Sequence, residues 1–202
     1  MRMFTVITGM HRSGTSYLAK KMHEDGLRMG TICTRESTAN PAGQYEHIEL
    51  AQLSEALLES NGGSWDRPPE GLIVDGGQAD RATEIVSGID GYKNPRAMLT
   101  LDPWSEAFAD CDIAIAGIFR HPLKVAESLH TRNEFSYQKS LDLWATYNGR
   151  LLDVLDDHGG TLTDFDATPD TPFKRSDFTY DREYRITDDV LALHDDLLAR
   201  AA

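Results

Sequence analysis

The residues best suited to chemistry lie close to the start of this sequence, between Gly9 and Ser16. The segment reads Gly-Met-His-Arg-Ser-Gly-Thr-Ser and joins a short apolar run (residues 3–7) to a predicted helix (residues 13–21). A glycine-bounded turn between a strand and a helix presents free backbone N–H groups at the positive end of the helix dipole. Such turns bind phosphate and other anions. We therefore predict that residues 9–16, here called the anion loop, hold a phosphate-like group.

The spacing of the anion loop fits the phosphate-binding motif G-x4-G-K-[ST] except at one position. Thr15 stands where that motif has its lysine, and Arg12 places a cation inside the loop instead. Kinases and ATPases use the lysine on the β- and γ-phosphates and the following hydroxyl on magnesium. The sequence thus indicates a phosphate-like ligand without the usual chemistry of nucleoside triphosphates. The predicted ligand-binding residues of the loop are Gly9, His11, Arg12, Ser13, Gly14, Thr15 and Ser16.

A second set of candidate ligand-binding residues follows the most apolar strand of the chain. Residues 112–119 form a nearly continuous apolar run, typical of a buried parallel strand, and Arg120 comes directly after it. Ser128 follows eight residues later, two turns into a helix that Pro122 is well placed to start. An arginine and a hydroxyl so placed can bind one phosphate from two sides, at the strand edge where ligands of parallel sheets collect. Taken alone, Arg120 could equally cap a carboxylate and Ser128 could face solvent.

The remaining segments must bring these residues to one edge of a sheet. Apolar positions at helical spacing predict further helices over residues 45–60, 78–89, 97–108, 137–157 and 187–201. Strands are predicted over residues 3–7, 27–29, 112–119 and 161–165, with another short strand at Tyr92 and Lys93. Because strands alternate with helices, we predict an α/β fold whose mainly parallel sheet is flanked by helices.

Length and composition limit the classes of protein. At 202 residues, the chain is expected to form a single domain over residues 1–202. A net charge of −13 argues against a nucleic-acid partner, because neutralising phosphates needs a basic face. No apolar run approaches the roughly 20 residues that span a bilayer, so we expect no membrane partner, no cleaved leader and a cytoplasmic location. Cys33 and Cys111 lack metal-binding spacing and are predicted to be reduced thiols.

These segments together resemble the sulfotransferases that use 3'-phosphoadenosine 5'-phosphosulfate (PAPS). Residues 11–16 resemble the family's 5'-phosphosulfate loop, in which Lys or Arg precedes Ser-Gly-Thr-[ST]. Residues 119–122 (Phe-Arg-His-Pro) with Ser128 resemble its 3'-phosphate motif. Residues 92–96 (Tyr-Lys-Asn-Pro-Arg) are similar to the Lys-Asp-Pro-Arg element of bacterial members. Weaker similarity continues to residue 202, so the resemblance covers most of the chain.

The resemblance implies a fold like that of the P-loop-containing nucleotide hydrolases, with PAPS as donor and no metal. It implies in-line transfer of a sulfuryl group to a hydroxyl or amine of a small-molecule, glycan or peptide acceptor. Arg12 and the amides of residues 13–16 would hold the 5'-phosphosulfate, and Lys93 would be a second cation on the bridging oxygen. A sulfuryl group carries less charge than a γ-phosphoryl group, so arginine and backbone amides can suffice without magnesium.

The chain departs from the family at the catalytic base. Cytosolic-type members have a histidine two residues after the strand lysine, and this chain has Pro95 there. Glu46, near the start of the helix predicted over residues 45–60, sits where many bacterial relatives carry a glutamate, and His47 beside it competes for the role. We predict that Arg12, Lys93 and Glu46 are catalytic, although a glutamate at a helix start can also serve as a cap. Of the basic loop that binds the 3'-phosphate in animal members, only residues 174–175 (Lys-Arg) offer a trace.

Two other functions stay open at this point. A small-molecule or nucleotide kinase could use the same loop and would bind ATP with magnesium. A non-catalytic nucleotide-binding protein on a decayed sulfotransferase scaffold would fit Pro95 at the usual base position. For a sulfotransferase or a kinase, we expect the acceptor to be recognised by the two long loops, residues 31–43 and 65–77.

Overall fold

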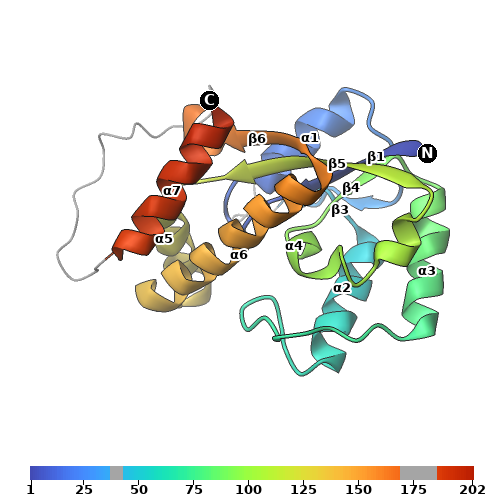
Figure 1. The fold of residues 1–202 in the computed structure, drawn as a ribbon, viewed down its shortest axis with the longest axis horizontal. Coiled ribbons are helices and arrows are strands. Elements are labelled where there is room, and N and C mark those ends of the chain that lie inside the picture. The colour runs from blue at the N-terminus through green and yellow to red at the C-terminus, as the bar shows by residue number, and fades with distance from the viewer. Residues whose placement is uncertain (37–42, 169–185) are drawn as a thin grey trace.

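The computed structural model describes residues 1–36, 43–168 and 186–202. Its main sheet has four strands, all parallel, in the order β4–β1–β5–β6 (Figure 1). β1 (Arg2–Thr8) pairs with β4 (Gly91–Lys93) on one side and with β5 (Cys111–Phe119) on the other, and β6 (Gly160–Asp164) pairs with β5. The predicted α/β fold with a parallel, helix-flanked sheet is confirmed.

The two faces of the sheet carry separate hydrophobic cores. Successive strand residues point to opposite faces, so Val6 and Ile115 belong to the larger core and Ile7 and Ala116 to the smaller one. Helix α1 (Thr15–Glu24) packs on the smaller core. The helices that contribute to the larger core are α2 (Ile48–Ser60), α3 (Gly76–Ser87), α4 (Ala97–Thr100), α5 (Pro122–Asn133), α6 (Tyr137–His158) and α7 (Asp188–Ala201).

The register of the sheet aligns the carboxyl ends of its strands. Ile7 pairs with Lys93, Thr8 with Gly117, and Phe119 with Asp164. The anion loop and the segments that follow β4, β5 and β6 therefore meet at one edge of the sheet. Ligands of open parallel sheets bind at this edge.

The helix predicted over residues 97–108 is interrupted. It divides into α4 and the short 3-10 helix η1 (Ser105–Phe108). Pro103 lies between the two parts, and it has no N–H to donate to a helical carbonyl. The apolar spacing predicted the helical segments but not the break between them.

The strand predicted over residues 27–29 is not formed. Instead, β2 (Ile32–Cys33) pairs antiparallel with β3 (Glu46–His47) in a separate two-stranded sheet. Because residues 46–47 belong to β3, α2 begins at Ile48 and not at residue 45 as predicted. The other predicted helices and strands are present, with bounds shifted by up to three residues.

Other expectations concern the cysteines, the membrane and two polar segments. Cys33 and Cys111 are both free thiols. Within the described ranges, no helix is long and apolar enough to cross a membrane. Residues 37–42 of the loop predicted over residues 31–43, and the basic pair at residues 174–175, lie outside the described residues.

Gly9 is required where the anion loop leaves β1. A Cβ atom at this position would lie 2.0 Å from the backbone oxygen of Ile118 on the neighbouring strand. We predict that Gly9→Ala lowers the free energy of unfolding by about 1–3 kcal/mol, because the backbone must move to relieve the clash. Denaturant unfolding followed by circular dichroism measures the change.

Gly149→Ala is the matched control, because Gly149 lies inside α6 and a Cβ atom there would meet nothing within 4 Å beyond the backbone of its own helix. This substitution should raise stability by about 0.5–1 kcal/mol through helix propensity. Equal effects of the two substitutions would contradict the close approach at Gly9.

Candidate functional site

The anion loop is a tight turn with unusual backbone angles. Arg12 has φ 72°, a left-handed conformation that is uncommon for residues other than glycine. Gly14, at φ 92°, precedes the first residue of α1, and a Cβ atom there would lie 2.4 Å from the ring of Phe165. The amide of Ser13 donates to the Met10 carbonyl at 3.1 Å and closes the turn. Strained backbone of this kind is frequent at ligand-binding sites, and the ligand-binding role of the loop stays a prediction.

The two motifs predicted to bind one ligand meet in space. Arg12 Nε donates a hydrogen bond of 2.8 Å to Ser128 Oγ on α5, across 116 residues of sequence. Burial lowers the pKa of Arg12, and the positive charges of Arg132 and Arg120 lower it further. Arg12 thus lies within electrostatic range of two further arginines in a chain whose net charge is −13. An anion bound beside Arg12 would be stabilised by these positive charges.

Arg120 lies at the same edge but contacts an internal carboxylate. Its Nε is 3.3 Å from Oδ1 of Asp166, and its guanidinium lies over the ring of Phe165 at 5.3 Å from the centroid. Asp166 also accepts a 2.9 Å hydrogen bond from the amide of His121. Both Phe165 and Asp166 belong to η2 (Phe165–Ala167), directly after β6. Sequence reasoning missed Asp166, although its place after a parallel strand could have indicated it.

The predicted catalytic pair Lys93 and Glu46 is assembled and largely buried. Lys93 Nζ donates to Glu46 Oε1 at 2.7 Å, and the two side chains are 4% and 16% exposed. Burial lowers the pKa of Lys93, while the negative charge of Glu46 opposes that shift. β4 supplies the lysine and β3 the glutamate, so a cation and a proton acceptor stand side by side near the anion loop.

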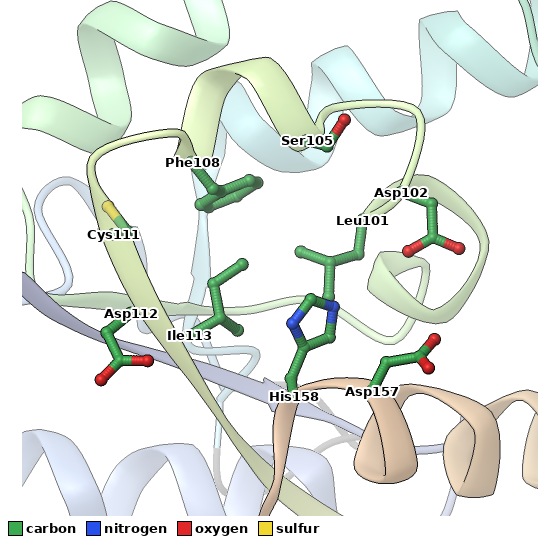
Figure 2. Close-up of a pocket in the computed structure, with 9 residues that line it drawn as sticks. All are labelled: Leu101, Asp102, Ser105, Phe108, Cys111, Asp112, Ile113, Asp157 and His158. Atoms are coloured by element: carbon green, nitrogen blue, oxygen red, sulfur yellow. The ribbon is translucent and has the colours of Figure 1, made fainter. Parts of the chain in front are cut away.

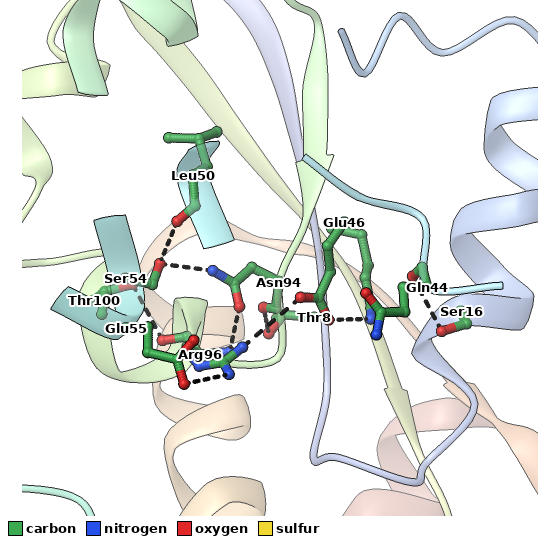
Figure 3. A network of polar contacts seen from close by, with 11 residues as sticks. Thr8, Ser16, Gln44, Glu46, Leu50, Ser54, Glu55, Asn94, Arg96 and Thr100 are labelled. Carbon is green, nitrogen blue, oxygen red and sulfur yellow. Dashed lines mark hydrogen bonds and ion pairs between the residues drawn. The ribbon is translucent and has the colours of Figure 1, made fainter. Parts of the chain in front are cut away.

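A buried polar network fixes the turn after β4 (Figure 3). Asn94 Nδ2 donates to Ser54 Oγ at 2.7 Å, and the Asn94 carbonyl accepts from Thr8 Oγ1 at 3.0 Å. The side-chain oxygen of Asn94 accepts from the amide of Arg96 at 2.9 Å. Because Asn94, Ser54 and Thr8 are buried, these bonds are shielded from water and hold the turn to β1 and α2.

His47, the competing base, serves as the N-cap of α2. Its Nδ1 accepts a 3.3 Å hydrogen bond from the amide of Leu50, and the residue is 5% exposed. Burial is the largest cause of the lowered pKa of His47. Nearby, Ser16 Oγ donates to the carbonyl of Gln44 at 3.1 Å and links α1 to the segment before β3. Among the described contacts, the ring of His47 thus has a structural role.

His11 lies beneath the long loop of residues 65–77. Its ring centroid is 4.4 Å from that of Trp65, and the Trp65 carbonyl accepts a 2.8 Å hydrogen bond from Tyr147 Oη. Burial lowers the pKa of His11 well below its ordinary value, and the charges of Arg96, Lys93, Arg132 and Arg12 add to the effect. Its Nε2 is buried and makes no hydrogen bond to any described residue. His11 therefore joins the loop to the cationic edge of the sheet.

A pocket opens at the opposite edge of the sheet, where β5 begins and α6 ends (Figure 2). Its volume is about 310 Å³. Its lining consists of Leu101, Asp102, Ser105, Phe108, Cys111, Asp112, Ile113, Asp157 and His158. None of the predicted site residues is among them, so this pocket is separate from the candidate site. In the described parts of the chain, no group of three or more His, Cys, Asp or Glu side chains could hold a metal ion.

Comparison with known proteins gives no further guide. No protein-family model matches the chain, and neither a curated protein nor a solved structure matches it. The site residues therefore stay predictions that rest on the sequence motifs and on the geometry described above.

The lowered pKa of His11 predicts a dependence of stability on pH. Above the ordinary histidine pKa of 6.5, the ring is neutral in both the folded and the unfolded chain. Below pH 6.5 the unfolded chain takes up a proton that the folded chain does not, so the free energy of unfolding falls with pH. We expect wild type to lose up to about 1.4 kcal/mol per pH unit more than His11→Gln in this range.

Chemical denaturation at pH values from 7.5 down to 5 measures the two slopes. His23→Gln is the control, because His23 is exposed on α1 and its replacement should leave the slope unchanged. Parallel profiles for wild type and His11→Gln would show that His11 takes up its proton equally in both states.

Proposed function

We propose that the protein is a sulfotransferase that moves a sulfuryl group from PAPS to a hydroxyl or amine. The hydrogen bond between Arg12 and Ser128 carries this proposal, because it joins the loop that resembles a 5'-phosphosulfate site to the motif that resembles a 3'-phosphate site. PAPS has an anionic group at each of these positions of one ribose. A single nucleotide could therefore contact both motifs.

The residues at this edge fit an anionic nucleotide. Arg12, Arg120 and Arg132 supply positive charge, and α1 begins at Thr15, within the anion loop. Ser13 Oγ is buried in the loop and has no hydrogen-bond partner among the described residues, which suits a ligand-binding hydroxyl. PAPS would supply an activated sulfuryl group whose leaving group is a phosphate.

The residues of this chain would then have separate roles in an in-line displacement. A bond forms between the acceptor oxygen or nitrogen and sulfur, while the bond from sulfur to the bridging oxygen breaks and its electron pair stays on the phosphate. Arg12 and the first amides of α1 would orient the phosphosulfate, and Lys93 would stabilise charge on the bridging oxygen. Glu46 would accept the acceptor's proton.

Glu46 is favoured over His47 as the base on geometric grounds. The Nδ1 lone pair of His47 already accepts from the amide of Leu50. Glu46 Oε1 instead contacts Lys93 Nζ, the cation assigned to the leaving group. A carboxylate in that position can take a proton close to the reacting atoms.

The first prediction from this function concerns nucleotide selectivity. Adenosine 3',5'-bisphosphate should bind roughly ten- to a hundredfold more tightly than adenosine 5'-monophosphate, because its 3'-phosphate gains charge-assisted hydrogen bonds. Isothermal calorimetry measures both affinities. Ser128→Ala should reduce the difference, whereas Thr131→Ala on the same helix, whose hydroxyl donates to the Glu127 carbonyl, should not.

Equal affinities for the two nucleotides would contradict the assignment of Arg120 and Ser128 to the 3'-phosphate. Greater thermal stabilisation by ATP with magnesium than by adenosine 3',5'-bisphosphate would favour the kinase. Binding of the bisphosphate without turnover of PAPS on a broad acceptor panel would favour the non-catalytic scaffold.

A second prediction separates the two candidate bases. Glu46→Gln should lower kcat by about a hundredfold or more, because glutamine cannot accept the proton. Its remaining oxygen can still accept from Lys93, so the fold and the affinity for adenosine 3',5'-bisphosphate should be kept. His47→Ala should keep most of the turnover but lose about 0.5–2 kcal/mol of stability with its helix cap.

Steady-state kinetics on one acceptor and melting curves for both variants make the test. A large kinetic loss in His47→Ala, with Glu46→Gln close to wild type, would transfer the role of base to the histidine.

A further inference from the structure

Arg96 is a cation of the site that the proposed donor chemistry does not use. It lies in the turn after β4, and its side chain is only 11% exposed. Its Nε is buried without a hydrogen-bond partner among the described residues. The nearest carboxylate oxygens are 3.8 Å away on Glu46 and 3.6 Å away on Glu55 (Figure 3). Both distances exceed that of a hydrogen bond, so these contacts are ion pairs without hydrogen bonds.

The Arg96 guanidinium therefore lacks hydrogen bonds to the carboxylates that neutralise its charge. A buried charge is costly unless it is paired and hydrogen-bonded. Glu46 already accepts a 2.7 Å hydrogen bond from Lys93, and the side chain of Glu55 is 55% exposed, so neither is a strong partner for Arg96. An incoming anion could replace Glu55 and bind the planar guanidinium through two parallel hydrogen bonds.

The position of Arg96 separates it from the residues assigned to the 3'-phosphate of the donor. Arg120 and Ser128 follow β5, on one side of β1, whereas Arg96 follows β4 on the other side. The charge of Arg96 contributes to the lowered pKa of His11 and opposes the burial that raises the pKa of Tyr147. These two rings contact Trp65 of the long loop predicted to recognise the acceptor. Arg96 therefore faces the side of the site next to that loop.

We propose that Arg96 binds an anionic group of the acceptor, so that the acceptor is an acidic molecule. It would carry a carboxylate or an ester of phosphate or sulfate near the hydroxyl or amine that receives the sulfuryl group. The inference rests on the proposed function, because it assigns the second substrate of the same site. Glu55 is the internal carboxylate that this anion displaces.

The test compares matched acidic and neutral probes by calorimetry, with and without saturating adenosine 3',5'-bisphosphate. The pairs are glucuronate with glucose, and 3-(4-hydroxyphenyl)propionate with its amide. Wild type should bind the acidic member of at least one pair about tenfold or more tightly than the neutral member. Arg96→Gln should abolish that preference and leave the affinity for the bisphosphate unchanged.

Two further variants keep the test independent of folding defects. Glu55→Gln removes the competing carboxylate from an exposed position and should raise the affinity for the acidic probe several-fold. Arg200→Gln loses the same charge at an ion pair with Asp156, near the end of α6, and should leave the preference intact.

The inference is overturned if no acidic probe binds better than its neutral partner, or if the preference survives Arg96→Gln. Failure of the proposed function gives a different result, because adenosine 3',5'-bisphosphate would then either not bind or bind without turnover of PAPS, and neither outcome depends on the preference for acidic probes. The titrations without nucleotide would still show in that case whether Arg96 binds an acidic ligand.

Discussion

The parallel pairing of β1 with β4 and β5 is the constraint on which the site depends. It brings the anion loop, the turn after Lys93 and Arg120 to one edge, although they are far apart in sequence. The approach of β1 to β5 is close enough that Gly9 lies against the Ile118 carbonyl. Without this register, the 2.8 Å contact between Arg12 and Ser128 could not form. The geometry of the site is therefore a property of the sheet more than of any one loop.

The charges at this edge share one physical arrangement. Lys93 contacts Glu46, Arg120 contacts Asp166, and Arg96 lies near Glu55. A largely buried cation needs a carboxylate nearby, and an acidic chain can provide one at each position. Anionic ligands would compete with these internal carboxylates for the same cations. Both proposals use this exchange: the donor would engage Lys93 and Arg120, and an acidic acceptor would engage Arg96.

Local sequence patterns predicted most of the elements. The apolar run before Arg120 indicated the buried strand β5. The apolar positions at helical spacing over residues 137–157 indicated the long helix α6. The patterns failed where non-local pairing decided the result. Residues 46–47 pair with residues 32–33, and because of this pairing α2 begins only at Ile48. No local propensity encodes a two-residue antiparallel pair between distant segments, because its hydrogen bonds depend on the rest of the fold.

The sequence by itself determined the anion loop, its arginine and the α/β class, because glycine spacing and apolar periodicity act over a few residues. It also supplied Lys93, Glu46, Arg120 and Ser128 as candidates. Only the tertiary structure decided how they are partnered: Lys93 with Glu46, Arg120 with Asp166, and His47 as a helix cap. These contacts join residues 47 and 46 positions apart in the first two cases, so their geometry depends on sheet register and helix packing. Arg96 shows the same limit, since its residue type was visible in the sequence and its incomplete pairing became visible only in the folded chain.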